Sequence, residues 1–144
     1  MYRYAELMDA ADFDALAELF AYARLSNEGV DGAVLGGAAI AALYRRTNRV
    51  HDNGTLMTRH LTANVAIDID EDANTATARS AFVVFQQTPN LPLQPIVTGR
   101  YRDRFERVDG GWRFAHRHIF VDHVGDVREH LAFDLAAFQA KHSE

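Results

Sequence analysis

The stretch that decides the fold is Thr98–His118, which reads TGRYRDRFERVDGGWRFAHRH. Two long segments of β-strand composition flank Asp109-Gly110, a dipeptide that favours a tight hairpin because both residues tolerate positive φ. The second segment alternates, so strand geometry predicts two faces. One face carries Trp112, Phe114, His116, His118 and Phe120, and the other carries Arg113, Ala115, Arg117, Ile119 and Val121. The basic and imidazole groups at 116–118 indicate either the edge of a solvated face or the lining of a cavity.

The composition favours one folded domain spanning residues 1–144. With 48% hydrophobic residues the chain can bury a core. A formal net charge of −5 argues against a general nucleic-acid binder. The lack of cysteine excludes disulfides, thiolate metal sites and thiol nucleophiles. There is no apolar run of ~20 residues and no signal-peptide pattern at the start, so we expect no membrane partner and a cytoplasmic location.

The first third of the chain predicts helices. A first helix ends at Asp9, and Asp12 suits the N-cap of a second helix with apolar residues at helical spacing. The glycine-rich stretch 26–37 is predicted to be a loop, and 38–46 a short helix. A carboxylate at a helix C-terminus opposes the helix dipole, so helix stability does not explain Asp9.

Two further strands are predicted before the hairpin, at 58–69 and 75–87. Strict alternation in the first of them predicts one face with Leu61, Ala63, Val65, Ile67 and Ile69, and an opposite face with His60, Thr62, Asn64, Ala66 and Asp68. The segment 87–95 holds all three prolines. Because proline cannot supply the N–H of a sheet ladder, this segment is predicted to be a stiff extended loop at the rim of a pocket.

The C-terminal residues predict an amphipathic helix. Asp126 resembles the N-cap of a capping box, and an apolar stripe follows at Val127, Leu131, Leu135 and Phe138. Helices, then strands, then a helix predict an α+β fold, in which a curved antiparallel sheet wraps on the N-terminal helices. Such a sheet tends to leave a cavity at its open end, where ligand sites form.

Several motifs together carry a family resemblance. They are the helix ending in Tyr-Ala-Glu-Leu-Met-Asp at 4–9, the capped second helix, His60 and Asn64 at a strand start, and the hairpin from Gly99 to Phe114. This pattern resembles the SnoaL-like branch of the nuclear transport factor 2-like superfamily over about residues 2 to 124. The resemblance implies a cone-shaped α+β barrel with an internal pocket and no cofactor. Members include polyketide cyclases, scytalone dehydratase, a ketosteroid isomerase, a dehydrochlorinase and non-catalytic dioxygenase β subunits.

The resemblance also implies site residues. The dehydratase and dehydrochlorinase types use an Asp–His pair, in which the carboxylate orients a histidine that removes a proton. Asp9 matches that carboxylate, His60 matches the histidine, and Arg117 matches an arginine in the dehydrochlorinase pocket. Tyr4 stands where the dehydrochlorinase has a lysine, and Met8 where scytalone dehydratase has a tyrosine. That dehydratase's second histidine has no counterpart in 75–85, so its known substrates are not supported.

Each candidate residue has a functional and a structural interpretation. A carboxylate beside a neutral histidine fixes its tautomer and makes it a general base, although Asp9 and His60 could equally be a solvated helix-end Asp or a buried structural pair. Arg117 could stabilise an enolate or a leaving anion, or pair with Asp122 or a helix carboxylate. The predicted substrate-binding residues, which could also be ordinary core or sheet surface, are Tyr4, Asn64, Tyr101 and Phe85.

The remaining basic residues favour structural roles. His116 and His118 could hold a metal only with a third ligand such as Asp122 or His123, so we predict no metal and place them at an interface or on the outer sheet face. The arginines of the hairpin are interleaved with Asp103 and Glu106. They predict a cross-strand salt-bridge surface, not a nucleic-acid stripe.

Three functions remain open. The first is a cofactor-independent lyase or isomerase in which His60 abstracts a proton from a hydrophobic cyclic substrate. The second is a non-catalytic module that binds a small hydrophobic ligand, and the third is a structural subunit like the dioxygenase β chain. An outer apolar patch with Trp112 and Phe114 predicts a homodimer or higher homo-oligomer.

Overall fold

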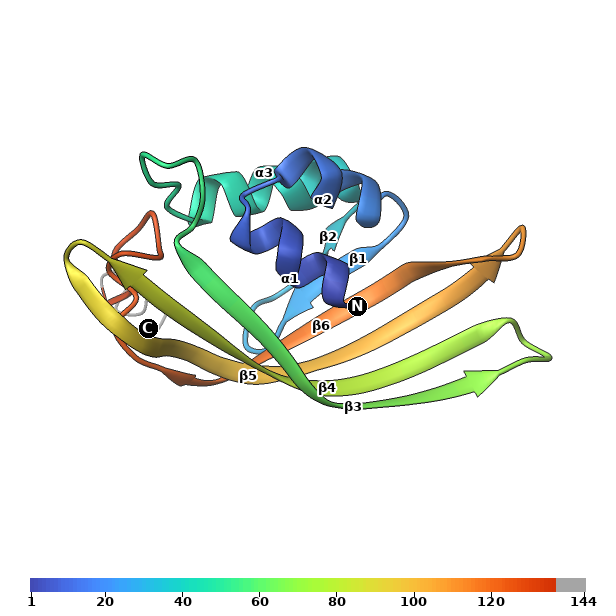
Figure 1. The fold of residues 1–144 in the computed structure, drawn as a ribbon. Coiled ribbons are helices and arrows are strands. Elements are labelled where there is room, and N and C mark those ends of the chain that lie inside the picture. The colour runs from blue at the N-terminus through green and yellow to red at the C-terminus, as the bar shows by residue number, and fades with distance from the viewer. Residues whose placement is uncertain (137–144) are drawn as a thin grey trace.

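A computed structural model describes residues 1–136 of the chain. The elements in chain order are α1 (Tyr2–Asp9), α2 (Phe13–Leu19), β1 (Arg24–Asn27), β2 (Val34–Leu35), α3 (Gly37–Thr47), β3 (Thr58–Asp70), β4 (Thr75–Thr88), β5 (Leu91–Val108) and β6 (Gly111–Val124). The sheet has the strand order β2-β1-β6-β5-β4-β3. Figure 1 shows the three helices together on the concave face of this long, curved and unclosed sheet. The predicted α+β fold, a curved sheet wrapped on N-terminal helices, is confirmed.

The helices form where the sequence predicts them. The Asp12 carboxylate accepts a hydrogen bond from the backbone N–H of Ala15 at 3.0 Å and so caps α2. Close packing of α3 on α2 needs Gly37, because a Cβ there would lie 1.8 Å from the carbonyl oxygen of Ala17. The helices bury their apolar sides against the sheet, with these residues at the centre of the core: Tyr4, Leu7, Met8, Phe13, Leu16, Phe20, Ile40 and Tyr44.

The loop predicted over 26–37 is partly wrong. β1 runs parallel to β6, with Arg24 beside His116 and Ser26 beside His118, and β2 pairs antiparallel to β1. These strands are too short for an alternating pattern to show. β1 forms because the free edge of β6 supplies its hydrogen-bond partners, which lie 92 residues further along the sequence, and β2 then pairs with β1.

The prediction of a proline-rich loop over 87–95 is also wrong. After a tight turn, β5 starts at Leu91 and pairs with β4, and Pro95 lies opposite Phe85. β6 pairs with β5 only from Val97 onward, so both prolines of the strand, Pro92 and Pro95, lie where β5 is a sheet edge. An edge position tolerates the missing N–H, and the β4–β5 register shifts at both ends of this stretch.

The hairpin turn is confirmed, but the two faces of β6 are not as predicted. Asp109 and Gly110 have φ of 51° and 77°. A β-bulge inserts Ala115 between Phe114, which pairs with Phe105, and His116, which pairs with Arg104. Phe114 therefore points into the core with Arg117 and Ile119, while His116 and His118 lie on the outer face. The predicted outer patch of Trp112 with Phe114 is wrong, since Phe114 is 3% exposed.

A second bulge changes the faces of β3. The β3–β4 register shifts between Ala63 and Ala66, and Asn64 sits there with φ of 53°. His60 and Thr62 precede the bulge and lie opposite Val84 and Phe82 on the inner face. Ile67 and Ile69 follow it on the same inner face, opposite Ala78 and Ala76. They are 52% and 55% exposed, because this end of the sheet extends beyond the helices (Figure 1).

The C-terminal helix predicted from Asp126 does not form over 126–131. The carboxylate of Asp126 instead binds the guanidinium and the backbone N–H of Arg128. Residues 127–131 make a turn that pairs with Asn48 through Leu131 and covers one end of the sheet. Phe138 of the predicted stripe lies outside the described residues. No helix within 1–136 is long and apolar enough to cross a bilayer.

Candidate functional site

Asp9, the last residue of α1, lies beside the start of β3. One of its carboxylate oxygens, Oδ1, accepts the hydroxyl of Thr58 at 2.8 Å. The backbone N–H of His60 donates to both oxygens, at 3.1 and 3.0 Å. The carbonyl of Asp9 also accepts the N–H of Leu56. The carboxylate therefore joins α1 to edge strand β3. At the C-terminus of a helix its negative charge does not stabilise the helix itself.

The structure brings Asp9 and His60 together. His60 Nδ1 lies 2.6 Å from Asp9 Oδ1, and the two side chains are only 6% and 13% exposed. An ionised carboxylate can only accept, so Nδ1 carries the proton of the neutral ring, and Nε2 is left with its lone pair. Within residues 1–136 no group hydrogen-bonds to Nε2. The geometry is that of an oriented imidazole base.

The charge state of Asp9 fits this arrangement. Burial favours the neutral acid, but the hydrogen bond and charge of His60, with the hydroxyl of Thr58 and the backbone N–H, outweigh burial and hold the pKa of Asp9 below its usual value. Asp9 is therefore a carboxylate at neutral pH. A fixed negative charge beside Nδ1 stabilises the imidazolium that forms when Nε2 takes a proton.

A cluster of tyrosines adjoins the histidine on its inner side. The rings of Tyr4 and His60 meet edge to face at 6.4 Å, and the hydroxyls of Tyr4 and Tyr44 are 2.8 Å apart. Tyr101 lies against Tyr4 and stacks on Phe82 with ring centroids 4.4 Å apart. Burial raises the pKa of all three tyrosines, so each is a neutral phenol that can donate a hydrogen bond.

Arg117 belongs to the same interior but is already paired. Its Nε and Nη2 donate to the two oxygens of Asp103 at 2.8 and 2.7 Å, and both side chains are almost completely buried. The guanidinium carbon lies 3.9 Å from the ring centre of Tyr101 and 4.4 Å from that of Tyr4. Burial opposes the positive charge, yet Asp103 outweighs it and raises the pKa of Arg117. Nη1 alone has no partner within residues 1–136.

Two of the predicted substrate-binding residues lie elsewhere. Asn64 sits at the β3 bulge and is exposed to solvent, so it does not share the inner face with His60. Phe85 pairs with Arg59 on the outer face. It lines an open concavity of about 860 Å³ between α1, residues 53–59 and the β4–β5 hairpin, and Asp9 lines the same concavity. Tyr4 and Tyr101, in contrast, are part of the interior cluster.

His130, a residue that no sequence pattern singles out, approaches the dyad from the C-terminal turn. The backbone of His130 is fixed by hydrogen bonds to Arg49 and Val127, and its ring is buried with no partner for Nδ1 among the described residues. Burial, together with the neighbouring His60, lowers the pKa of His130 to about 4, so the ring is neutral at neutral pH. His130 carried no local sequence signal, because the turn that buries it was interpreted as a helix.

Asp103 lies in the interior and not on the predicted salt-bridge surface, and strand alternation is the signal that identifies it. Tyr101, Asp103 and Phe105 share one face of β5, and the first and last of these are typical core residues. Metal ligation has no support in the described residues, where no group of three or more His, Asp or Glu side chains converges. Asp122 instead pairs with Arg100, and His123 bonds to Thr98.

A family model for the SnoaL-like domain matches residues 1–118. The chain belongs to the SnoaL-like family. No functionally curated protein matches this SnoaL-like chain. Among solved structures it is similar to Rv3472 of Mycobacterium tuberculosis, a protein of unknown function, with 28% identity over 85% of this chain and 68% of the other, at a TM-score of 0.67.

Two proteins of Novosphingobium aromaticivorans are also similar to the SnoaL-like chain. One is a nuclear transport factor 2-like protein with a cystatin-like fold, at 25% identity over 96% of this chain and 81% of the other, with a TM-score of 0.66. The other is a candidate scytalone dehydratase, at 24% identity over 88% and 81%, with a TM-score of 0.67. These matches support the cystatin-like α+β fold of the sheet and helices.

Proposed function

We propose that this protein is a cofactor-independent lyase or isomerase in which His60 acts as the general base and Asp9 orients it. The observation that carries the proposal is the 2.6 Å contact between Asp9 Oδ1 and His60 Nδ1, which leaves Nε2 free to accept a proton. A positioned base of this kind contributes about 10²–10⁴-fold to a rate. The substrate class is a small hydrophobic, cyclic molecule with an acidic C–H beside a carbonyl or a leaving group.

In the proposed reaction His60 Nε2 removes the proton, and the electron pair of the broken C–H bond moves toward the carbonyl oxygen or expels the leaving group. The imidazolium then returns the proton to the isomerised carbon or to the departing group. Asp9 stays ionised throughout and stabilises the imidazolium through Nδ1. No cofactor takes part.

The developing anion needs a donor, and two candidates belong to the interior cluster that adjoins His60. Tyr4 is a neutral phenol whose ring contacts the imidazole. Arg117 retains one unpartnered nitrogen, Nη1, although its charge is balanced by Asp103. We assign this donor role to Tyr4 first, because its hydroxyl can rotate from Tyr44 to a substrate oxygen without breaking an ion pair.

Proton abstraction can be tested without knowing the natural substrate. A panel of cyclic ketones is incubated with the protein in D₂O, and loss of the α-proton signals is followed by NMR. His60→Gln and Asp9→Asn should each lower the exchange rate by about 10²–10⁴-fold. His123→Gln changes an exposed histidine remote from the dyad and serves as the control. Full exchange by a folded His60→Gln variant would exclude the mechanism.

A non-catalytic module that binds the same class of ligand is the alternative. It is supported by the closed pairing of Arg117 with Asp103, which leaves the interior with little uncompensated charge. It predicts that a hydrophobic ligand co-purifies and is released chemically unchanged. A dioxygenase-β-like subunit would instead co-purify with a larger partner chain. Mass spectrometry of the purified protein distinguishes a bound small ligand from a bound partner chain.

Self-association also remains a prediction. The prediction of self-association was based on an apolar patch of Trp112 and Phe114. Phe114 is buried, and Trp112, at 43% exposure, remains on the surface. Leu61, on the outer face of edge strand β3, and Leu93 on the β4–β5 hairpin offer further exposed apolar surface. Light scattering after gel filtration should give a dimer mass, and a monomer at micromolar concentration would contradict the prediction.

A further inference from the structure

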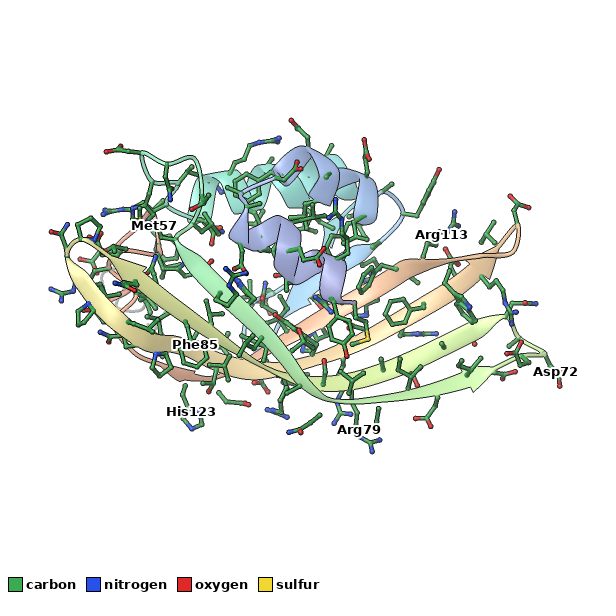
Figure 2. The ribbon with its side chains drawn as sticks, viewed as in Figure 1. Met57, Asp72, Arg79, Phe85, Arg113 and His123 are labelled. Carbon is green, nitrogen blue, oxygen red and sulfur yellow. The ribbon has the colours of Figure 1, made fainter. Side chains whose placement is uncertain are left out.

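The outer face of the sheet carries a cluster of basic side chains that the proposed activity does not use. Cross-strand register places Arg79, Arg102, His118 and Ser26 in one row across β4, β5, β6 and β1. Arg104, His116 and Arg24 form the next row along the sheet. In Figure 2 Arg79 points away from the helices, on the side of the sheet opposite the candidate active site.

Ser26 joins the two histidines at the centre of this cluster. Its Oγ lies 2.7 Å from His116 Nε2 and 2.6 Å from His118 Nδ1. A hydroxyl has one proton, so one imidazole accepts from Ser26 and the other must donate to it. The three side chains thus form a small fixed network whose outer nitrogens remain available to a ligand.

The four arginines around this network have no acidic partner among residues 1–136. Three other arginines on the sheet are paired, Arg100 with Asp122, Arg107 with Glu71 and Arg113 with Glu106, whereas Arg59 on β3 makes no ion pair within residues 1–136. Arg24, Arg79, Arg102 and Arg104 make no ion pair within the described residues, and all four are exposed. Arg79 and Arg102 even lie directly opposite each other. Like charges at opposite positions destabilise a sheet, so the protein by itself gains nothing from this arrangement.

The local field is consistent with a cationic site. Burial, with the charges of Arg24 and Arg104 and the neighbouring His118, lowers the pKa of His116, and the more distant Asp103 only partly offsets this. His116 is therefore neutral at neutral pH. Its network can donate and accept hydrogen bonds while the guanidinium groups supply the charge.

We propose that this cluster, Arg24, Arg79, Arg102 and Arg104 around Ser26, His116 and His118, binds a compact doubly charged oxyanion, namely the phosphate group of a small molecule. Guanidinium groups match phosphate oxygens in charge and in paired hydrogen-bond geometry. The site lies on the opposite face of the sheet from His60, so it is independent of the proposed catalytic function.

The surroundings favour a small ligand over a nucleic acid or another long polyanion. Asp68 lies in the same row as Arg104, two strands away, and Asp122 lies on the other side of the cluster. Asp68 would repel a chain of phosphates that ran beyond the arginines, as would the net charge of −5, while Asp122 is already paired with Arg100. The cluster is therefore suited to a single phosphate group.

The test uses the full-length chain and inorganic phosphate, with sodium chloride at equal ionic strength as the reference. Phosphate should raise the melting temperature and shift the imidazole NMR signals of His116 and His118. Arg102→Gln and Arg104→Gln should each weaken phosphate binding about five- to tenfold. Arg102→Gln should also melt higher than the wild type without phosphate, because it removes the like-charge contact with Arg79. Arg46→Gln, an exposed arginine on α3, is the matched control.

Two results would overturn the site. Equal phosphate responses in Arg102→Gln, Arg104→Gln and Arg46→Gln would mean that phosphate acts only as bulk salt. A change of oligomeric mass in the Arg102 and Arg104 variants, with the phosphate response intact, would show that the cluster is an interface between copies of this chain.

Discussion

The carboxylate of Asp9 holds His60 at two points, through the imidazole Nδ1 at 2.6 Å and through the backbone N–H at 3.0 Å. The C-terminal end of α1 therefore fixes the orientation of the imidazole ring and the position of the strand that carries it. Any change at Asp9 should alter the local backbone as well as the base.

The first prediction concerns Asp9→Asn. The amide of asparagine is uncharged and has one acceptor oxygen where aspartate has two. We therefore expect the free energy of unfolding to fall by about 1–3 kcal/mol. Urea denaturation at pH 7 measures it. Asp14→Asn, which loses only an exposed ion pair with Arg45, should lower the midpoint much less than Asp9→Asn. An unchanged midpoint in Asp9→Asn would mean that the dyad contributes nothing to the fold.

The lowered pKa of Asp9 gives a second prediction. The folded state binds this proton less readily than the unfolded chain, whose carboxyl titrates near the ordinary value of 3.8. The stabilisation is therefore present above that value and is lost as the pH falls through the lower folded-state pKa. The unfolding free energy of the wild type should drop below pH 4 more steeply than that of Asp9→Asn, and parallel curves would contradict this.

His130 gives a third prediction, in a different pH range. Its pKa is about 4 in the folded state against 6.5 in the unfolded chain, so the unfolded state takes up a proton first. Stability should fall between pH 6.5 and 4, by about 3 kcal/mol in total. His130→Leu should remove most of this slope and leave the smaller part due to His116, whereas His123→Gln should keep all of it. Denaturation midpoints at half-unit pH steps resolve the two curves.

The fourth prediction concerns the buried pair of Arg117 and Asp103. Asp103→Asn leaves the guanidinium charge without compensation beneath α1 and should cost about 3–5 kcal/mol. Replacing both residues, as in Arg117→Met with Asp103→Leu, should recover much of that loss. Double-mutant analysis of unfolding free energies measures the coupling. Additive losses would show that the pair does not act as a unit.

Gly99 supports a fifth prediction. A Cβ at this position would lie 2.0 Å from the carbonyl oxygen of Phe120 and 2.6 Å from the ring of Phe82. Gly99→Ala should therefore destabilise the fold by at least about 2 kcal/mol. Gly111→Ala is the control, since its nearest neighbour would be 3.7 Å away. Thermal melting of the two variants separates the steric cost from the general effect of replacing glycine.

The sequence was informative where structure is local. The Asp12 cap, the Asp109-Gly110 turn and the helix over 38–46 depend on neighbouring residues, and each formed as predicted. β1 could not be predicted, because its partner, β6, lies far away in the chain. Likewise His130 reaches the dyad through a turn whose backbone hydrogen bonds come from residues 48–49 and 127.

The two bulges account for the misplaced side chains of β3 and β6. Asn64 and Ala115 each add one residue to a strand, and alternation counted from one end then gives the wrong face beyond it. The Asp9–His60 contact was unaffected because His60 precedes the bulge of β3. The bulges are the reason why Asn64 does not share a face with His60, and why Phe114 does not share one with His116.

The extra residue at Ala115 lets Phe114 and Arg117, three positions apart, point to the same side of β6. Deleting this one alanine would make Phe114 and His116 consecutive residues that still lie opposite Phe105 and Arg104, so the bulge would disappear and both faces of the strand would be kept. Deleting any residue between His116 and Phe120 would instead exchange the interior and exterior side chains that follow it. Position 115 is therefore the place where β6 tolerates the loss of one residue.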